Sequence, residues 1–327
     1  MTSFDADVKD LRILYQLDLD ARKSYAEIGK SVRLSKQVVA YRIARMVEAG
    51  VIRGFHVVID VSKLGFISCV IWVGLKHDSP EMERGMLEHF KKDSRTWWIG
   101  GREISKRMIA AAFLVSNHYE LYEMLMEFLK KYRHNVREIS TQIYYRFYAF
   151  RKDYLAGSGM RTTKPLILYS QEKAEVDETD LRLLSTIGGD ARISLVELAK
   201  KTGITPLTAM ARIRGLEKKG VIRGYRPFID LGKIGYKTYK MELELEDFSK
   251  REEIMRFAAR NPNTTYIFEK IGGSDVDIEL ELRSEKELRS FADELRSRFS
   301  EAITGAELSA YEKEHKFVYL PPFSPAP

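Results

Sequence analysis

The run Gly50-Val51-Ile52-Arg53-Gly54 recurs without change at residues 220–224, 170 positions further along the chain. Its surroundings recur at the same offset, because the Asp-Leu-Arg at residues 10–12 is matched at residues 180–182 with no insertion in between. A period of this length exceeds the roughly 20–50 residues of a solenoid repeat. The sequence therefore contains two copies of one multi-element unit, and each copy can be compared with the other.

A helix-turn-helix motif precedes this run in both copies. A Ser-x-x-Glu capping box, which is typical of helix starts, occurs at Ser24 and again at Ser194. After a tight turn, Ser35 and Thr205 are the expected N-caps of a further helix, which ends at the glycine that opens the repeated run. Short helices, a tight turn and a capped third helix predict a helix-turn-helix.

The third helix carries the residues expected to contact DNA, because its N-terminal part enters the major groove in helix-turn-helix proteins. Lys36 and Gln37 suit base contacts, although a solvated basic helix face is the alternative interpretation. In the second copy Pro206 and Leu207 replace them, so this copy either binds phosphates and thymine methyls with little sequence preference or has lost DNA binding. The predicted DNA-binding residues are Ser35, Lys36, Gln37, Tyr41, Arg42, Arg45, Arg53, Thr205, Arg212, Arg214 and Arg223.

A small sheet domain follows each helix-turn-helix. In the first copy we expect strands at residues 51–61, 66–76, 96–101, 108–115 and 136–150, and helices at 80–92 and 117–133. In the second copy we expect strands at residues 221–231, 236–246, 264–271, 276–283 and 306–319, and helices at 249–261 and 285–300. After the first strand, this order is βαββαβ, the ferredoxin-like pattern. The predicted fold class is α+β, with two winged-type helix-turn-helix domains, each followed by a ferredoxin-like domain.

Domain boundaries follow from this order and from the small residues at 156–159, which are typical of a linker. The expected units are a helix-turn-helix domain at 1–60, a ferredoxin-like effector and dimerisation domain at 61–155, a linker at 156–175, a second helix-turn-helix domain at 176–230 and a second ferredoxin-like domain at 231–327.

This combination resembles the Lrp/AsnC (feast/famine) transcription regulators. The helix-turn-helix, the Gly-Val-Ile-Arg-Gly-aromatic run and the βαββαβ domain carry the resemblance, which covers residues 5–150 and 175–320. It implies sequence-specific binding to double-stranded DNA, and a sheet domain that pairs subunits and binds small effectors, often amino acids. The family usually has one copy per chain, whereas this sequence has two.

The resemblance also implies an effector loop, which typically reads Gly-x-x-Asp in this family. Residues 272–275 fit that pattern, and in the first copy Gly100 and Gly101 occupy the glycine positions with Glu103 in place of the aspartate. A glycine pair more commonly forms an ordinary hairpin, which is the alternative interpretation. The residues that the resemblance assigns to an effector are Gly272, Gly273, Asp275, Gly100 and Gly101.

Composition argues against several other functions. The six histidines are scattered without metal spacing, Cys69 is the single cysteine, and no nucleophile or phosphate-loop motif occurs, so we expect no metal, no cofactor and no catalytic residues. The chain has no long uncharged apolar run and no signal peptide, which favours a cytoplasmic protein without membrane contact. The alternatives are a non-DNA adaptor protein and, less favoured, an enzyme that resembles the sirohaem decarboxylases on the same fold.

The two predicted sheets differ in their surfaces. In the second copy Glu242, Asp277, Glu279 and Glu281 alternate with apolar residues, whereas the first-copy strands are apolar on both faces. Burying the acidic face against an apolar one costs free energy unless the carboxylates are paired. We therefore expect a homodimer built through residues 66–150 of two chains, with an intramolecular pseudo-dimer as the alternative.

Overall fold

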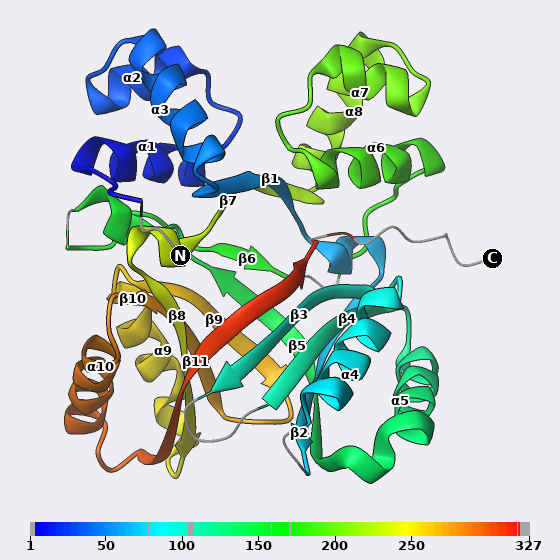
Figure 1. The fold of residues 1–327 in the computed structure, drawn as a ribbon, viewed down its shortest axis with the longest axis vertical. Coiled ribbons are helices and arrows are strands. Elements are labelled where there is room, and N and C mark those ends of the chain that lie inside the picture. Colours follow the sequence, from blue (N-terminus) through cyan, green and yellow to red (C-terminus); the bar gives the residue numbers. More distant parts are fainter. Residues whose placement is uncertain are drawn as a thin grey trace.

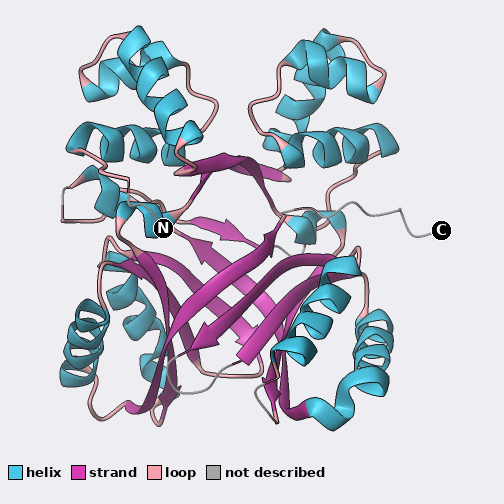
Figure 2. Ribbon diagram, viewed as in Figure 1, coloured by secondary structure: helices cyan, strands magenta, loops and turns pink. Residues whose placement is uncertain are grey.

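The computed structural model describes residues 4–76, 79–103, 108–157, 159–169, 172–318 and 320 (Figure 1). Two helical units lie side by side at one end of the molecule, and a two-stranded ribbon joins them. A curved sheet with helices on its outer flanks forms the other end (Figure 2). Within the described residues, no helix is long and apolar enough to cross a membrane.

Three short helices form each helix-turn-helix unit, and their caps lie where the sequence predicts. Side-chain oxygens of Ser24, Ser35, Ser194 and Thr205 accept backbone N–H bonds at four helix starts. These bonds satisfy donors that have no partner within the helix itself. The helices are α1 (Val8–Leu19), α2 (Tyr25–Val32) and α3 (Lys36–Glu48) in the first copy, and α6 (Glu178–Gly189), α7 (Leu195–Thr202) and α8 (Pro206–Lys218) in the second.

The repeated Gly-Val-Ile-Arg-Gly run leads from α3 and α8, the two recognition helices, into a shared ribbon. Strands β1 (Ile52–Ile59) and β7 (Ile222–Ile229) pair with each other in antiparallel fashion, so that His56 lies opposite Arg226. Each strand thus has its partner in the other copy. The ribbon crosses between the two helix-turn-helix units and the sheet below them (Figure 1).

The ferredoxin-like elements also follow the predicted order. In the first copy they are β2 (Ile67–Leu75), α4 (Pro80–Lys92), β3 (Thr96–Glu103), β4 (Met108–Val115), α5 (His118–Tyr132) and β5 (Val136–Ala149). In the second copy they are β8 (Lys237–Leu245), α9 (Arg251–Arg260), β9 (Thr264–Ile271), β10 (Val276–Leu282), α10 (Glu285–Arg298) and β11 (Ile303–Phe317). Short 3-10 helices lie at Val61–Leu64, Arg133–Asn135, Asp153–Ala156, Leu231–Ile234 and Phe248–Lys250.

These strands close into one antiparallel barrel that neither copy forms alone. The strand order is β2-β4-β3-β11-β8-β10-β9-β5, and β5 pairs back with β2. The last strand of each copy makes the closure. β5 pairs with β2 along its first half and with β9 along its second half, and β11 pairs likewise with β8 and then with β3.

Helices cover only the outside of this barrel (Figure 2). Met86, Phe90 and Phe128 of α4 and α5 pack on the outer face of the first copy's strands. Ile254 of α9 and Leu288 of α10 do the same in the second copy. Each such side chain stabilises the fold by about 1.5–3 kcal/mol when fully buried. The inner faces of the two sheets are left to cover each other.

The barrel interior explains why the first-copy strands are apolar on both faces. Val70 and Trp72 of β2 point inward and are buried, and the second copy contributes the buried Lys240 and Asp277. The prediction that a second chain covers this face is wrong, because the chain's own second copy covers it, which is the pseudo-dimer alternative. Glu242, Asp277 and Glu281 form ion pairs with lysines of the same chain, so much of the expected cost is offset. Association with further copies is untested and stays a prediction.

The described residues of the segment predicted as a linker, residues 156–175, contact the barrel. Strand β6 (Leu166–Leu168) pairs with β5. The Arg161 guanidinium donates to the carbonyl oxygens of Ala259, Asn261 and Thr264 and pairs with Asp153 at 2.9 Å. The connection between the copies is therefore held against the barrel, in contrast to a free spacer.

We predict that the buried lysine on β8 is essential for stability. Lys240→Met keeps the side-chain length but removes the charge. Asp277 and Glu242 then share Lys270 alone, so the free energy of unfolding should fall by about 3–5 kcal/mol. Glu244→Gln on the same strand changes an exposed charge and should alter it by less than about 0.5 kcal/mol. Urea denaturation of both variants measures this, and equal effects would contradict a paired interior.

Candidate DNA interface and central cavity

The first turns of α3 present the predicted base-reading residues to solvent. Val39 and Ile43 are buried on the inner side of the helix, whereas Lys36 and Gln37 are exposed and Tyr41 is 68% exposed. Helical periodicity places these three polar side chains on one outward face. Their exposure is what a recognition helix requires for contact with base edges.

Two predicted phosphate contacts have other partners. Arg42 donates to Asp7 and to the buried Asp10, at 2.8 Å in each case, and Arg45 donates to Asp10 at 2.6 Å. Arg212 makes the same kind of contacts with two aspartates in the second copy. These arginines hold the first helix of each unit against the recognition helix, so the structure gives them a packing role where the sequence suggested DNA.

Arg53 also lies away from the recognition face, which corrects its predicted placement. Its guanidinium stacks 4.0 Å from the ring centroid of Phe228 on the opposite ribbon strand and lies 3.4 Å from Glu314. The side chain therefore faces the space between ribbon and barrel. Arg223, its counterpart on β7, is partly buried at the same position of the ribbon.

Two exposed cations near the recognition helix were not singled out from the sequence. Lys30 lies in the last turn of α2, and Arg33 forms the C-cap of that helix in the left-handed conformation with φ 58°. Both precede Lys36 by a few residues, so they extend a basic surface at the N-terminal end of α3. The second copy keeps a lysine at the first of these positions and has Gly203 at the second, so the two copies differ there too.

The second recognition helix exposes apolar groups instead. Leu207 is 70% exposed, and Pro206 and Ala211 are exposed beside it. Thr205 caps the helix, and Arg214 is the exposed cation of its middle turn. This surface retains the shape of a helix-turn-helix with fewer polar groups.

The predicted effector loop of the second copy is a tight connection between β9 and β10. Gly272 and Gly273 have φ values of 83° and 75°, which favour glycine. The Asp275 carboxylate accepts a hydrogen bond from the Leu245 backbone N–H at 2.8 Å. The structure thus shows a structural partner for Asp275, and an effector at this loop stays a prediction.

In the first copy the predicted loop glycines lie inside a strand. Gly100 and Gly101 belong to β3, and a Cβ at Gly100 would lie only 2.4 Å from the Trp98 ring. Gly100 is therefore required where the indole packs over the backbone. The connection that follows, residues 104–107, and the side chain of Glu103 lie outside the described residues.

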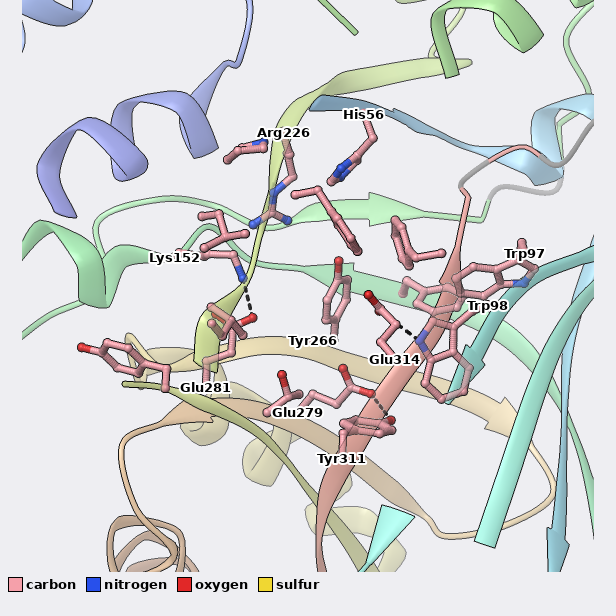
Figure 3. Close-up of a pocket in the computed structure, with 18 of the residues that line it drawn as sticks. His56, Trp97, Trp98, Lys152, Arg226, Tyr266, Glu279, Glu281, Tyr311 and Glu314 are labelled. Carbon is pink, nitrogen blue, oxygen red and sulfur yellow. Dashed lines mark hydrogen bonds and ion pairs between the residues drawn. The ribbon is translucent and has the colours of Figure 1, made fainter. Parts of the chain in front are cut away.

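A cavity of about 930 Å³ lies between the ribbon and the open end of the barrel (Figure 3). β1 and β7 line one side of it, and β10 and β11 line the other. Its walls are largely aromatic. The aromatic lining includes Trp97, Trp98, Tyr144, Phe147, Phe228, Tyr266, Phe268, Tyr311 and Phe317.

Charged groups also line the cavity, and most are paired. Lys152 forms an ion pair with Glu281, whose carboxylate also accepts the Tyr154 hydroxyl. Glu314 accepts from the Trp98 indole at 3.2 Å, and it is the partner of Arg53.

Arg226, another of the four lysine and arginine residues of this lining, pairs at 2.6 Å with Asp18, a fully buried carboxylate on α1. The cavity wall is thus tied to the first helix-turn-helix unit. Sequence reasoning missed this site, because its residues come from both copies and converge only when the barrel closes.

Burial changes the proton affinity of several cavity groups. Desolvation raises the pKa of Glu279 to about 7, against the opposing charge of Lys240, and raises the pKa of Glu314 to about 7 as well. Desolvation and the nearby Arg226 lower the pKa of His56 to about 3, so this imidazole is neutral at physiological pH.

Comparisons with known proteins agree with this geometry. A model described as winged helix-turn-helix DNA-binding matches residues 7–53 and 176–223, one stretch in each copy. The chain is 31% identical over 117 residues to an uncharacterised HTH-type transcriptional regulator of Pyrococcus furiosus, a match that covers 36% of this chain and 79% of that protein. It is 41% identical over 64 residues to the leucine-responsive regulatory protein of Rhizobium meliloti, covering 20% of this chain and 41% of that protein.

Two exposed recognition helices on a shared ribbon define a DNA-binding protein of the helix-turn-helix class. The chain belongs to the Lrp/AsnC family of transcription regulators, and it carries two copies of the family's helix-turn-helix.

The whole two-copy arrangement also has a counterpart of known structure. The crystal structure of the siroheme decarboxylase NirDL matches with a TM-score of 0.64 and 15% sequence identity, covering 97% of this chain and 94% of that chain. At this identity the likeness establishes a common fold and leaves the activity open.

We predict a pH effect that isolates the cavity carboxyl of Glu279. Because its pKa in the folded state, about 7, exceeds the ordinary value of 4.5, its stabilising contribution is present below pH 4.5 and is lost as pH rises through 7. Glu279→Gln has no carboxyl group to titrate at this position. When the pH is raised from 5 to 8, the free energy of unfolding of the variant should therefore rise by about 1–3 kcal/mol relative to that of the wild type. Denaturation at both pH values measures the difference, and a pH-independent difference would contradict the raised pKa.

Proposed function

We propose that the first helix-turn-helix supplies most of the sequence specificity of this regulator. The observation that carries the proposal is the exposure of Lys36, Gln37 and Tyr41 on one face of α3, next to the exposed Lys30 and Arg33. Lysine and glutamine side chains hydrogen-bond base edges in the major groove, and the flanking cations attract phosphates.

The second helix-turn-helix contributes binding with little sequence choice. Its recognition helix exposes Leu207 and Ala211, which can contact thymine methyl groups, and Arg214, which can reach a phosphate. The shared ribbon fixes both units on one side of the molecule (Figure 1). One chain thereby presents a pair of helices to DNA, an arrangement that two-chain regulators obtain by dimerisation.

Substitutions in the two recognition helices should have unequal effects. Gln37→Ala should weaken operator binding by about 1–3 kcal/mol and relax sequence preference, whereas the matched change Leu207→Ala should leave the preference intact. Lys36→Ala should behave as Gln37→Ala does. Genome-wide recovery of bound DNA provides the operator, and titrations at several salt concentrations then measure affinity. Loss of sequence choice in Leu207→Ala alone would reverse the assignment of the two copies.

We further propose that the protein is not an enzyme, although its fold matches that of a siroheme decarboxylase. The related proteins of higher identity are transcriptional regulators. Purified protein that shows tetrapyrrole absorbance or decarboxylates sirohaem would refute this proposal. The target of the protein is the genome, which supports the cytoplasmic location expected from the sequence.

An amino-acid effector at residues 272–275 is a separate proposal that rests on family resemblance. If Asp275 binds an effector ammonium, calorimetric titration with the common amino acids should show binding that Asp275→Asn abolishes. Asparagine retains an oxygen that can accept from the Leu245 N–H, so the variant tests charge with little change in the loop. Absence of heat in both the free and the DNA-bound protein would leave Asp275 with its structural hydrogen bond alone.

Homo-oligomer formation remains a proposal as well. The inner sheet faces are occupied within the chain, so an interface with a second copy must use the outer helices or the exposed ribbon edges. Native mass spectrometry of the full chain distinguishes a monomer from a higher assembly.

A further inference from the structure

The central cavity combines aromatic walls with carboxyl groups that come from the second copy. Three of its cations, Arg53, Lys152 and Arg226, already have carboxylate partners within ion-pair distance. The fourth cation of the lining, Lys237, is exposed, and the lining holds five carboxyl residues against these four cations, namely Asp230, Glu279, Glu281, Glu285 and Glu314. The cavity is therefore poorly suited to a negatively charged ligand.

Glu279 differs from Glu281 and Glu314, which have cation partners. Among the described residues its contact is a hydrogen bond from the Tyr311 hydroxyl, and no lysine or arginine lies within ion-pair distance of it. Its carboxyl lies deep in the molecule yet remains partly accessible from the cavity (Figure 3). A buried carboxylate without a cation is costly, because the charge has lost its hydration.

The aromatic walls suit a positive charge. The structure already contains two such contacts near this site: Arg53 lies 4.0 Å from the Phe228 ring, and Lys240 lies 5.0 Å from the Trp72 ring. Rings of tyrosine and tryptophan attract cations through their quadrupoles, most strongly where water is excluded. Trp98 and Tyr266 add further ring surface to the cavity wall.

We propose that the central cavity binds a small organic cation, an amine on an apolar or aromatic body, whose ammonium pairs with Glu279 while its body packs against the aromatic walls. The cavity volume of about 930 Å³ accommodates a ligand of this size. The site is distinct from the Gly-x-x-Asp loop, since none of residues 272–275 lines it.

This ligand is also placed to influence DNA binding, a step that rests on the proposed function. Glu279 lies on the barrel side of the cavity, whereas Arg53 and Arg226 lie on the ribbon strands that continue from the two recognition helices. Arg226 is further linked to α1 through Asp18. A ligand that contacts both sides stabilises one position of the ribbon relative to the barrel, and thereby one arrangement of the helices.

Titration calorimetry of the full chain tests the binding step. The probes are tryptamine, phenethylamine, agmatine and spermidine, with tryptophol and indole-3-acetate as neutral and anionic counterparts of tryptamine. We expect at least one of the four amines to bind. If tryptamine binds, tryptophol and indole-3-acetate should bind at least about tenfold more weakly than tryptamine does. Binding at pH 7 should release protons, seen as a dependence of the heat on buffer ionisation, because the ammonium favours ionised Glu279.

Glu279→Gln should abolish both the binding and the proton release, and Glu244→Gln is the matched control at an exposed position of the adjacent strand. If Glu279→Gln does not fold, proton release on amine binding to the wild type tests the role of Glu279, and binding without proton release would contradict it. No heat with any of the four amines, or tighter binding of indole-3-acetate than of tryptamine, would overturn the proposal.

DNA titrations separate this inference from the proposed function. If the chain binds an operator and a bound amine changes that affinity at least about threefold, the regulatory step is supported. If an amine binds without changing the DNA affinity, the regulatory step is refuted and the proposed binding site is still supported. A chain that binds an amine but no DNA refutes the proposed function and not the cavity.

Discussion

Asp277, at the centre of the barrel, is fully buried and lies 2.8 Å from the Lys240 ammonium and 2.6 Å from the Lys270 ammonium. Glu242 completes this cluster, and the Trp72 ring of the first copy covers Lys240. Two carboxylates and two ammonium groups balance in charge, so the second copy can turn a charged sheet face inward. Without this pairing the two inner faces could not meet, because each unpaired ion would cost several kcal/mol.

Closure of the barrel lets the two copies take different roles on one scaffold. The first copy supplies an apolar inner face and a recognition helix with polar side chains. The second copy supplies the charged inner face, the carboxyls of the cavity and a recognition helix that exposes Leu207. In a homodimer of single-copy chains every position is present twice and must suit both halves. Fusion in one chain removes that constraint. Equivalent positions of the two copies can then differ, as Lys36 and Pro206 do.

Local features of the fold could be predicted from the sequence, and contacts between the copies could not. Caps such as Ser24 and Ser35 act within a few residues, so helix starts were predicted within a residue or two. The partner of Arg53 is Glu314, 261 positions away, and no periodicity indicates it. The alternation of polar and apolar residues around Glu279 correctly predicted that one face of this strand is acidic. The face is buried because Lys270, on another strand, pairs with Asp277, and the alternation does not indicate that pairing.

The two helix-turn-helix units are anchored differently, and this asymmetry bears on how the protein acts. Asp18 joins α1 to Arg226 at the cavity and accepts the backbone N–H of Lys152. Its counterpart in the second copy is Gly188, which has no side chain to make such contacts. Lys233 of the second copy also donates to the Ala49 carbonyl at the end of α3.

The first unit is thus tied through buried polar contacts to the cavity wall, and it is the unit whose helix exposes polar side chains. A buried ion pair resists displacement, because separating its members leaves both charges unpaired. The Asp18 pair thus links Arg226 to α1, and the ion pairs of Asp10 with Arg42 and Arg45 link α1 to the recognition helix. Among the described residues the second unit has Gly188 at the position of Asp18 and so lacks this ion pair. Because Arg226 lies on β7, which continues from α8, the Asp18–Arg226 pair joins the first unit to the strand that carries the second recognition helix.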